Sequence, residues 1–249
     1  MSDPIIPAAT LIVVRDRAAG APELLMVERA EGMAFAGGAL VFPGGRIDDA
    51  DAVLAAQLGL GEDGAAAVAA IRETIEETAI PAGLTPMPDA PTALELQADL
   101  VAGGDFANLL NARLLSIDRA ALTRFARWVP KFHAVRRFDT LFFVAAAPPG
   151  DWRPNPIAGE CAGAFWLSAA EVLAREERGE ARLIFPTRRN LERLAQHANV
   201  AAIRADAAAH PTAPVTPWIE EHDGEKFITI PSHLGYPIVR EKLDGVWRG

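Results

Sequence analysis

Residues 65–79, together with the loop Phe42-Pro43-Gly44-Gly45 before them, constrain this chain more than any other stretch. Residues 65–79 are rich in Ala and Glu and contain neither Gly nor Pro, which favours a helix. Pro81 disfavours helical backbone in the residue before it, so the sequence predicts that the helix ends near Ile80. We expect the rest of the chain to be organised around this helix and loop.

Three glutamates, Glu73, Glu76 and Glu77, share about one third of the circumference of this helix, at about 100° per residue. The helix dipole disfavours anions in the last turns by about 0.3–1 kcal/mol each. Arg72 offers local relief, since it lies four residues before Glu76. A divalent cation that prefers oxygen ligands, such as Mg²⁺, would stabilise the cluster further. The sequence therefore predicts a metal site here, and the alternative is a solvated acidic face.

The run Arg72-Glu73-Thr74-Ile75-Glu76-Glu77-Thr78-Ala79-Ile80 resembles the second half of the signature of the Nudix hydrolases, and Gly45 resembles its first glycine. All charged positions of that half are present. Gly64 stands in place of the spacer glutamate, Thr74 at an apolar position and Ala79 in place of the last glycine. The stretch between the first glycine and the arginine is also longer than in the family. Glu62 or Asp63 is the expected substitute for the spacer glutamate.

The Phe-Pro-Gly-Gly-x-x-Asp loop, the lengthened signature and the segment 128–143 resemble the Nudix branch that includes peroxisomal coenzyme A diphosphatases. The resemblance spans about residues 7–194. It implies an α/β (α+β) fold, a Nudix-type α/β/α sandwich with a mixed sheet and a helical insertion. It also implies metal-dependent hydrolysis of the diphosphate bond in a small nucleoside diphosphate derivative, with coenzyme A or acyl-coenzyme A as the leading substrate.

The resemblance assigns the three glutamates of the helix as ligands of Mg²⁺ or Mn²⁺, and it implies that Arg72 orients a glutamate by charge-assisted hydrogen bonding. The general base is one of Glu76, Glu77 and Glu160. Many relatives carry a further acid, which serves as a metal ligand or a base, in the loop before a Trp-containing strand, and Glu160 is the first candidate for it. Asp151 is the second candidate.

Four further residues are candidate substrate contacts. Gly44 and Gly45 let the backbone approach a metal or phosphate closely, because they have no side chain. Arg136 and Arg137 precede an apolar run, and guanidinium groups bind phosphate bidentately. A surface arginine pair is the structural alternative.

Short apolar runs predict the strands of the sheet. The first two, 9–15 and 23–28, are separated by a turn that contains Gly and Pro, so we expect them to pair as a hairpin. A third run delivers the chain to the glycine loop. The later strands are expected in the second half of the chain. The remaining predicted strands are 39–42, 128–130, 140–147 and 165–167.

The expected main domain covers residues 1–205, with insertions at 46–64 and 85–127 and an extension at 206–249 that packs on the domain or on a dimer partner. The first insertion should contain a short helix, 51–58. The second should contain three helices, which cover a pocket or serve only as a structural elaboration. Thr187 is expected to cap a helix that continues through His197, with Leu191 and Leu194 facing the core. In the extension, Asp223-Gly224 is a plausible hairpin turn. The three predicted helices of the second insertion are 92–102, 106–115 and 120–127.

Composition excludes several classes of function. The chain has 249 residues, of which 50% are hydrophobic, and a net charge of −9, which argues against binding of duplex nucleic acid. Cys161 is the only cysteine, so no intrachain disulfide forms. The first residues lack the pattern of a signal peptide, and no apolar run reaches the length of a membrane helix. We therefore expect a cytoplasmic protein without a membrane partner.

Three alternatives to a coenzyme A diphosphatase stay open at this point. The first is a pyrophosphatase for ADP-ribose or NAD, which would use the same chemistry. The second is a hydrolase that releases pyrophosphate from nucleoside triphosphates. The third is a non-catalytic module that binds a nucleotide derivative, although such a module is expected to lose acids from the signature and this chain retains all three.

Overall fold

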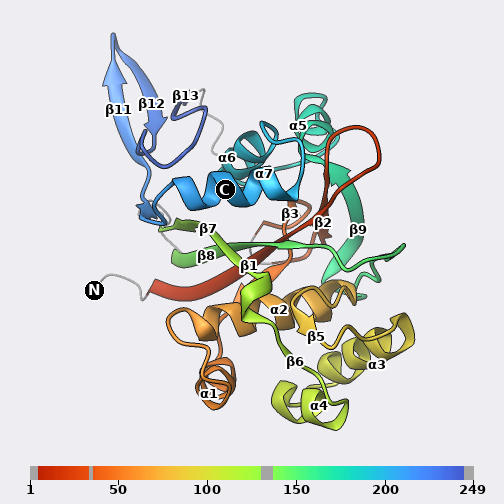
Figure 1. The fold of residues 1–249 in the computed structure, drawn as a ribbon. Coiled ribbons are helices and arrows are strands. Elements are labelled where there is room, and N and C mark those ends of the chain that lie inside the picture. Colours follow the sequence, from red (N-terminus) through yellow and green to blue (C-terminus); the bar gives the residue numbers. More distant parts are fainter. Residues whose placement is uncertain (1–4, 34–35, 130–136, 244–249) are drawn as a thin grey trace.

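The computed structural model describes residues 5–33, 36–129 and 137–243. An eight-stranded sheet crosses the middle of the molecule in the order β10-β7-β8-β1-β2-β3, with β4 beside β1 and β9 beside β2 (Figure 1). Its strands are β1 Ile5–Arg15, β2 Glu23–Arg29, β3 Leu40–Val41, β4 Gly44–Arg46, β7 Thr123–Trp128, β8 Arg137–Ala146, β9 Cys161–Ser168 and β10 Pro214–Val215.

The sheet is mixed. Strand β1 runs parallel to β8, from the pair Ile5 and Arg137 to the pair Val14 and Ala146. It runs antiparallel to β2, where Val14 lies opposite Leu24, so the hairpin predicted from the first two apolar runs is confirmed. These central strands are apolar on both sides because helices cover both faces of the sheet.

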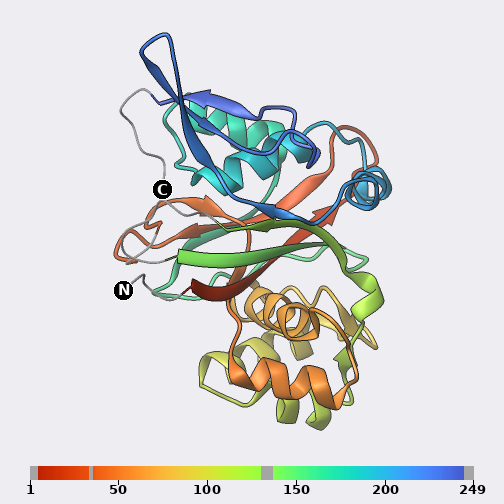
Figure 2. The ribbon, with the colours of Figure 1, turned by 90° about the vertical axis from the view of Figure 1, so that its left-hand side faces the viewer.

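Helices lie on both faces of the sheet (Figures 1 and 2). Successive residues of β1 divide between two cores, because side chains alternate along a strand. Leu11 belongs to the core that also contains Ile71 of α2, whereas Ile12 belongs to the core that also contains Leu191 of α6. The expected α/β/α sandwich is confirmed. The helices are α1 Asp49–Gln57, α2 Gly64–Thr78, α3 Ala90–Val101 and α4 Phe106–Ala112 on one face, and α5 Ala169–Glu177, α6 Phe185–Leu194 and α7 Val200–Ala209 on the other.

The predicted helices 92–102 and 106–115 correspond to α3 and α4, but the predicted helix 120–127 is wrong. A single 3-10 turn, Arg119–Ala121, leads into strand β7, which pairs antiparallel with β8. A register shift between Arg124 and Ala126 interrupts the alternation of buried and exposed residues that identifies a strand. The short strands β5 Leu84–Thr85 and β6 Ser116–Ile117 pair with each other. Since β5 precedes α3 and β6 follows α4, this pair joins the two ends of the segment that contains these helices.

Two further expectations about the second half of the chain need correction. Thr187 does not cap α6, because the N-cap is Ile184 and Thr187 lies buried in the first turn. The helix also ends at Leu194, earlier than expected, although Leu191 and Leu194 are buried as predicted.

Residue 206 lies inside α7, a helix that the sequence analysis missed. After it the chain returns to the sheet, since β10 pairs with β7. The Asp223-Gly224 turn joins β11 Trp218–His222 to β12 Glu225–Thr229, as predicted, and β13 Arg240–Lys242 completes a small sheet that projects from the molecule (Figure 1).

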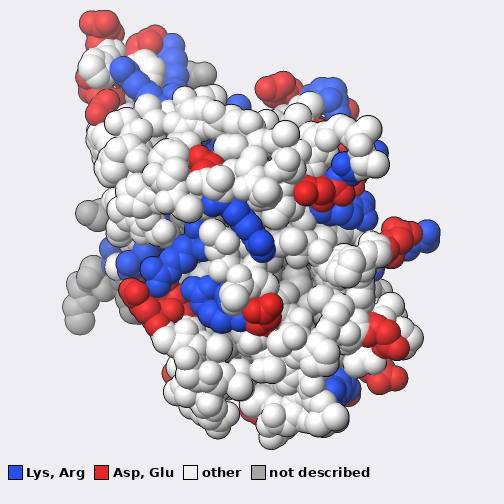
Figure 3. Space-filling model, in the orientation of Figure 1, with Lys and Arg blue, Asp and Glu red and all other residues white. Residues whose placement is uncertain are grey.

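Charged side chains of both signs lie next to each other across the middle of the face shown in Figure 3. Two arginines of β7 form ion pairs with aspartates. Arg124 Nε lies 2.5 Å from Asp63 Oδ2, and Arg127 Nη2 lies 2.6 Å from Asp139 Oδ2.

Within the ranges that the structure describes, no helix has both the length and the apolar character needed to cross a membrane.

Candidate functional site

Helix α2 packs its apolar side against the sheet and carries the predicted carboxylates. Ile71 and Ile75 are fully buried in the core. Glu77 is also buried, at 6% exposure, while Glu73 and Glu76 are half-buried. The helix therefore does not divide into one buried and one solvated face, because its acidic side lies against other parts of the chain.

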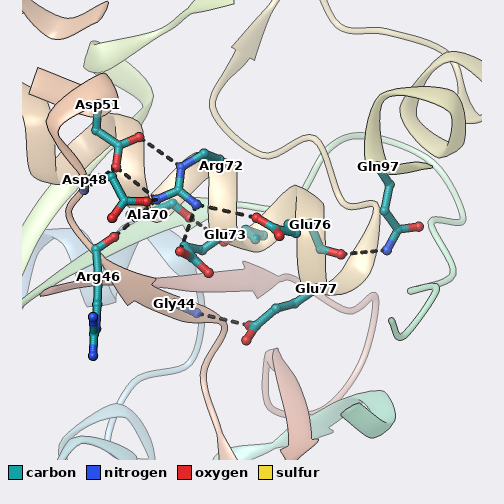
Figure 4. Close-up of polar contacts among 11 residues, drawn as sticks. Gly44, Arg46, Asp48, Asp51, Ala70, Arg72, Glu73, Glu76, Glu77 and Gln97 are labelled. Atoms are coloured by element: carbon teal, nitrogen blue, oxygen red, sulfur yellow. Dashed lines mark hydrogen bonds and ion pairs between the residues drawn. The ribbon is translucent and has the colours of Figure 1, made fainter. Parts of the chain in front are cut away.

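Arg72 is the centre of the polar contacts on α2 (Figure 4). Its Nη1 donates to Glu73 Oε1 at 2.8 Å and to Glu76 Oε2 at 3.4 Å. Its Nε and Nη2 donate to the two carboxylate oxygens of Asp51 at 2.9 Å each. Burial lowers the pKa of Arg72, but the hydrogen bond to Asp51 and the charge of Glu73 more than offset this, so the pKa lies above its usual value. Arg72 stays charged and fixes two of the three glutamates.

The sequence analysis missed three contacts of Arg72 Nη2: Asp51, the Arg46 carbonyl at 3.2 Å and Asp48 Oδ2 at 3.5 Å. Asp51 is the most deeply buried of these residues. It lies in α1, within the first insertion, and is 2% exposed. Its Oδ2 also accepts a hydrogen bond from the backbone N–H of Asp48 at 2.9 Å. The expected substitutes for the spacer glutamate, Glu62 and Asp63, pair with Arg124 instead. No signal in the sequence distinguishes Asp51 from the acids beside it.

The two glycines of the loop contact the glutamates of α2 directly. The backbone N–H of Gly44 donates to Glu77 Oε2 at 3.1 Å. A Cβ atom on Gly45 would lie 2.4 Å from the carboxyl carbon of Glu73, closer than real Cβ contacts allow. Glycine is therefore required at position 45 for Glu73 to reach its place.

Burial raises the pKa values of all three glutamates. The pKa of Glu77 rises to about 8, mainly through burial and then through the charge of Glu73, while the Gly44 N–H and the charge of Arg29 act against the rise. The pKa of Glu73 rises to about 7 through burial, against the lowering effect of Arg72. Burial also raises the pKa of Glu76. Arg72 alone does not offset the charges of the three glutamates. The cluster therefore carries an excess of negative charge that is costly to bury.

Glu160 lies in the turn just before β9, and its charge contributes to the raised pKa values of Glu76 and Glu77. The Ile157 N–H, three residues before it, donates to the Glu77 carbonyl at 3.3 Å, so the chain brings this exposed residue near the end of α2. The alternative acid, Asp151, pairs with Arg153 on the exposed part of the same loop, with 3.8 Å between Oδ2 and Nε.

The donor set of this cluster fits a hard divalent cation. Carboxylate oxygens are the side-chain ligands that Mg²⁺ and Mn²⁺ prefer, and the raised pKa values of Glu73 and Glu77 mark negative charge that a cation would relieve. In the described part of the chain, no three acidic, cysteine or histidine side chains are gathered as a ready-made metal site. Arg72, which bonds Glu73 and Glu76, occupies oxygens that a cation would share.

The chain is similar to the crystal structure of a NUDIX hydrolase from Alicyclobacillus acidocaldarius. The two share 35% sequence identity with a TM-score of 0.71, and the match covers 82% of this chain and 97% of that one. This chain belongs to the Nudix hydrolase family.

Two more distant Nudix structures are also similar. The NUDIX domain of Shewanella oneidensis NrtR, solved with ADP ribose, is 13% identical with a TM-score of 0.46 over 78% of this chain and 88% of that one. The MutT protein from Methanosarcina mazei Go1 is 15% identical with a TM-score of 0.46 over 79% of this chain and 96% of that one. No protein-family model and no curated protein matches the chain.

Ala79 occupies the position of the last glycine in the Nudix signature. Its φ is 57°, in the left-handed region, and its N–H donates to the Ile75 carbonyl at 2.8 Å to close the helix. A left-handed residue is a common way to end a helix and is usually glycine. This Nudix protein therefore ends α2 with a left-handed residue and accepts the strain of an alanine there.

The remaining predicted substrate contact is Arg137, the first residue of β8, which pairs with Ile5 of β1. Arg136 lies outside the described residues. Arg29, at the end of β2, was missed by the sequence analysis although its charge acts on Glu77. Arg29 only ends an apolar strand, so its place in the sequence gives no sign that its charge acts on a glutamate of α2.

Proposed function

We propose that this Nudix hydrolase cleaves the diphosphate bond of coenzyme A or acyl-coenzyme A, with Mg²⁺ or Mn²⁺ as cofactor. The observation that carries the proposal is the carboxylate cluster of α2, which is complete at every charged position of the second half of the Nudix signature and contacts Gly44 and Gly45. Such a cluster is suited to a cation and a diphosphate together.

Each residue of the cluster has a separate part in the proposal. Glu73, Glu76 and Glu77 would hold the cation. When bound, the cation would polarise a phosphoryl oxygen and lower the pKa of the attacking water. Arg72 keeps Glu73 and Glu76 in place through its hydrogen bonds, and the Gly44 N–H holds Glu77.

The general base is one of Glu76, Glu77 and Glu160, and its task is to take a proton from water as the water oxygen bonds to phosphorus. Glu160 lies on a different segment from the other two. A substitution of Glu160 therefore leaves the glutamates of α2 unchanged, and Glu160→Gln tests the role of Glu160 separately from theirs.

The coenzyme A assignment rests on the resemblance of the glycine loop, the lengthened signature and the segment 128–143 to the coenzyme A diphosphatase branch. Hydrolysis would break one P–O bond of the diphosphate and add the water oxygen to one phosphorus. The products would be 4′-phosphopantetheine and 3′,5′-ADP. Arg137 is the described candidate for a contact with a phosphate of the substrate.

Mass spectrometry of the reaction products tests this proposal. Purified protein is incubated with Mg²⁺ or Mn²⁺ and with coenzyme A, acetyl-coenzyme A, reduced NAD, ADP-ribose and nucleoside triphosphates, with Glu77→Gln as the control. We expect 4′-phosphopantetheine and 3′,5′-ADP from coenzyme A, absent in the control. Cleavage of ADP-ribose or NAD alone would keep the reaction and replace the substrate. Release of pyrophosphate from triphosphates would indicate the second alternative, and no turnover with either metal would favour a binding module.

A further inference from the structure

The carboxyl end of α2 is held by residues from two other segments. The last four carbonyl groups of a helix have no partner within it. Here each of the four accepts a hydrogen bond, and only one donor comes from the residue that ends the helix. The pairs are Ala79 N to Ile75 O at 2.8 Å, Gln97 Nε2 to Glu76 O at 3.0 Å, Ile157 N to Glu77 O at 3.3 Å and Asn155 N to Thr78 O at 2.8 Å.

Gln97 joins the two segments to each other. It lies on α3, within the helical insertion, and is 4% exposed. Its Nε2 donates to the carbonyls of Glu76 at 3.0 Å and Asn155 at 2.8 Å, and its Oε1 accepts from Asn155 Nδ2 at 2.7 Å (Figure 4 shows the contact with Glu76). Both donor hydrogens of the amide are used, so the side chain is held in one orientation.

The segment that Gln97 holds leads directly to Glu160. From Asn155 the backbone continues through Ile157, whose carbonyl accepts from the Cys161 N–H at 3.1 Å. At the far end, the carbonyl of Glu160 accepts from the Ala30 N–H at 2.8 Å. The loop is therefore fixed at one end to α2 and Gln97 and at the other end to the residue after β2. Loss of the Gln97 contacts leaves the first of these ends held only by the backbone bonds of Asn155 and Ile157 to α2.

We propose that Gln97 is a positioning residue of the hydrolase: its amide holds the loop that carries Glu160 against the carboxyl end of α2 and so sets the place of Glu160 relative to Glu76 and Glu77. This inference rests on the proposed function for its catalytic consequence. Gln97 acts through Glu160. The helical insertion thereby contributes to the order of the site.

Gln97→Leu removes the donors and the acceptor while keeping a side chain of similar size. We expect kcat to fall about 10- to 100-fold, because a misplacement of about 1 Å has effects of this size. KM should change by less than about twofold, since the side-chain hydrogen bonds of Gln97 go to Glu76 and Asn155, which are not substrate-binding candidates. Hydrogen exchange of residues 153–161 should become faster in the free protein, because the loop loses its side-chain contacts with α3.

A double-mutant cycle with Glu160→Gln separates positioning from a general structural role. If Gln97 acts through Glu160, its substitution should have little further effect on kcat once Glu160 is glutamine. A structural role alone would make the two effects additive. Additive losses, or an unchanged kcat in Glu160→Gln, would overturn the proposal.

Two further variants control the test. Gln57→Leu changes an exposed glutamine at the end of α1 and should alter neither kcat nor the exchange of residues 153–161. Asn155→Ala, on the exposed loop, removes the partner amide and should act in the same direction as Gln97→Leu even if that variant fails to fold.

If the wild-type protein turns over nothing on the substrate panel, the proposed function fails. The exchange measurement then decides alone whether Gln97 fixes the loop. Unchanged exchange in both loop variants would overturn the inference.

Discussion

Helices α2 and α6 lie on opposite faces of the sheet, and both carry buried charge. On α2, Arg72 faces Asp51, Glu73 and Glu76, with the buried Glu77 beside them, so acids outnumber the base. On α6 the buried charged residues are Arg189 and Arg193, each 1% exposed, and Glu192, which is 8% exposed. The excess of buried charge is therefore negative on α2 and positive on α6.

The charges on α6 are matched by neighbours of opposite charge and by aromatic rings. Arg189 Nη2 lies 2.7 Å from Glu192 Oε1, and Arg193 Nε lies 2.7 Å from Asp206 Oδ2. The guanidinium of Arg193 also lies 4.2 Å from the ring centroid of Phe125. A matched buried ion pair fixes packing, whereas the excess of carboxylates on α2 is the feature from which we propose a cation. The comparison distinguishes a structural use of buried charge from a functional one.

The largest expected effect comes from Glu77→Gln on α2. The amide removes a cation ligand, so turnover should fall by about 10³-fold or more, an effect of about 4 kcal/mol in activation free energy. The fold should be retained, because the change removes a buried charge instead of creating one. Steady-state kinetics and a thermal melt measure the two effects. Wild-type turnover in the purified variant would remove Glu77 from the metal site.

Arg193→Met on α6 should show the opposite pattern. It leaves Asp206 largely buried without its arginine, so the free energy of unfolding should fall by about 3 kcal/mol. The site on α2 should keep its kcat, since the two helices lie on opposite faces of the sheet. Urea denaturation and kinetics at a temperature where the variant is folded measure both. A stability equal to that of the wild-type protein would show that this pair is not structural.

Addition of Mn²⁺ sharpens the comparison. A ligand that binds only the folded state adds about 2.7 kcal/mol of stability at 100 times its dissociation constant. We expect Mn²⁺ to raise the melting temperature of the wild-type and Arg193→Met proteins by similar amounts and to have a much smaller effect on Glu77→Gln. An equal shift in all three proteins would indicate that the cation binds elsewhere.

The smallest expected effect tests the polar contacts near α6. The Trp128 Nε1 donates to the Tyr236 hydroxyl at 2.9 Å, and that hydroxyl donates to Asn190 Oδ1 at 2.9 Å. Tyr236→Phe removes both bonds and should lower the free energy of unfolding by about 1–2 kcal/mol without altering turnover. Chemical denaturation measures the change, and a reduced kcat would contradict the separation of the two helices.

Local patterns in the sequence were sufficient for much of the fold. The run at 9–15 and the run at 23–28 predicted a hairpin because both are apolar and short. The helix predicted at 120–127 was wrong because the stretch begins with alanines and because a register shift interrupts the alternating pattern of strand β7. Helix α7 was missed because its composition gave no stripe of apolar residues, and Asn199 caps it by accepting from the Ala202 N–H at 2.8 Å.

The candidate site likewise contains residues that the sequence predicted and residues that it did not. The acids and arginine of α2 follow from their spacing along one helix, and the glycine loop from its position before it. Asp51 and Gln97 reach the same helix from the two insertions, 21 residues before Arg72 and 21 residues after Glu76. Their contacts depend on how separate helices pack, and a single sequence contains no local record of that packing.

The bond between Trp128 and Tyr236 joins residues that are 108 positions apart, and it lies in the core beneath α6. During synthesis the strand β7 emerges long before Tyr236 does, so this core stays open while most of the chain is being made. Its apolar residues are then accessible to chaperones and to other nascent chains. Premature termination before Tyr236 should therefore yield aggregating fragments, and recovery of such products would depend on chaperone supply.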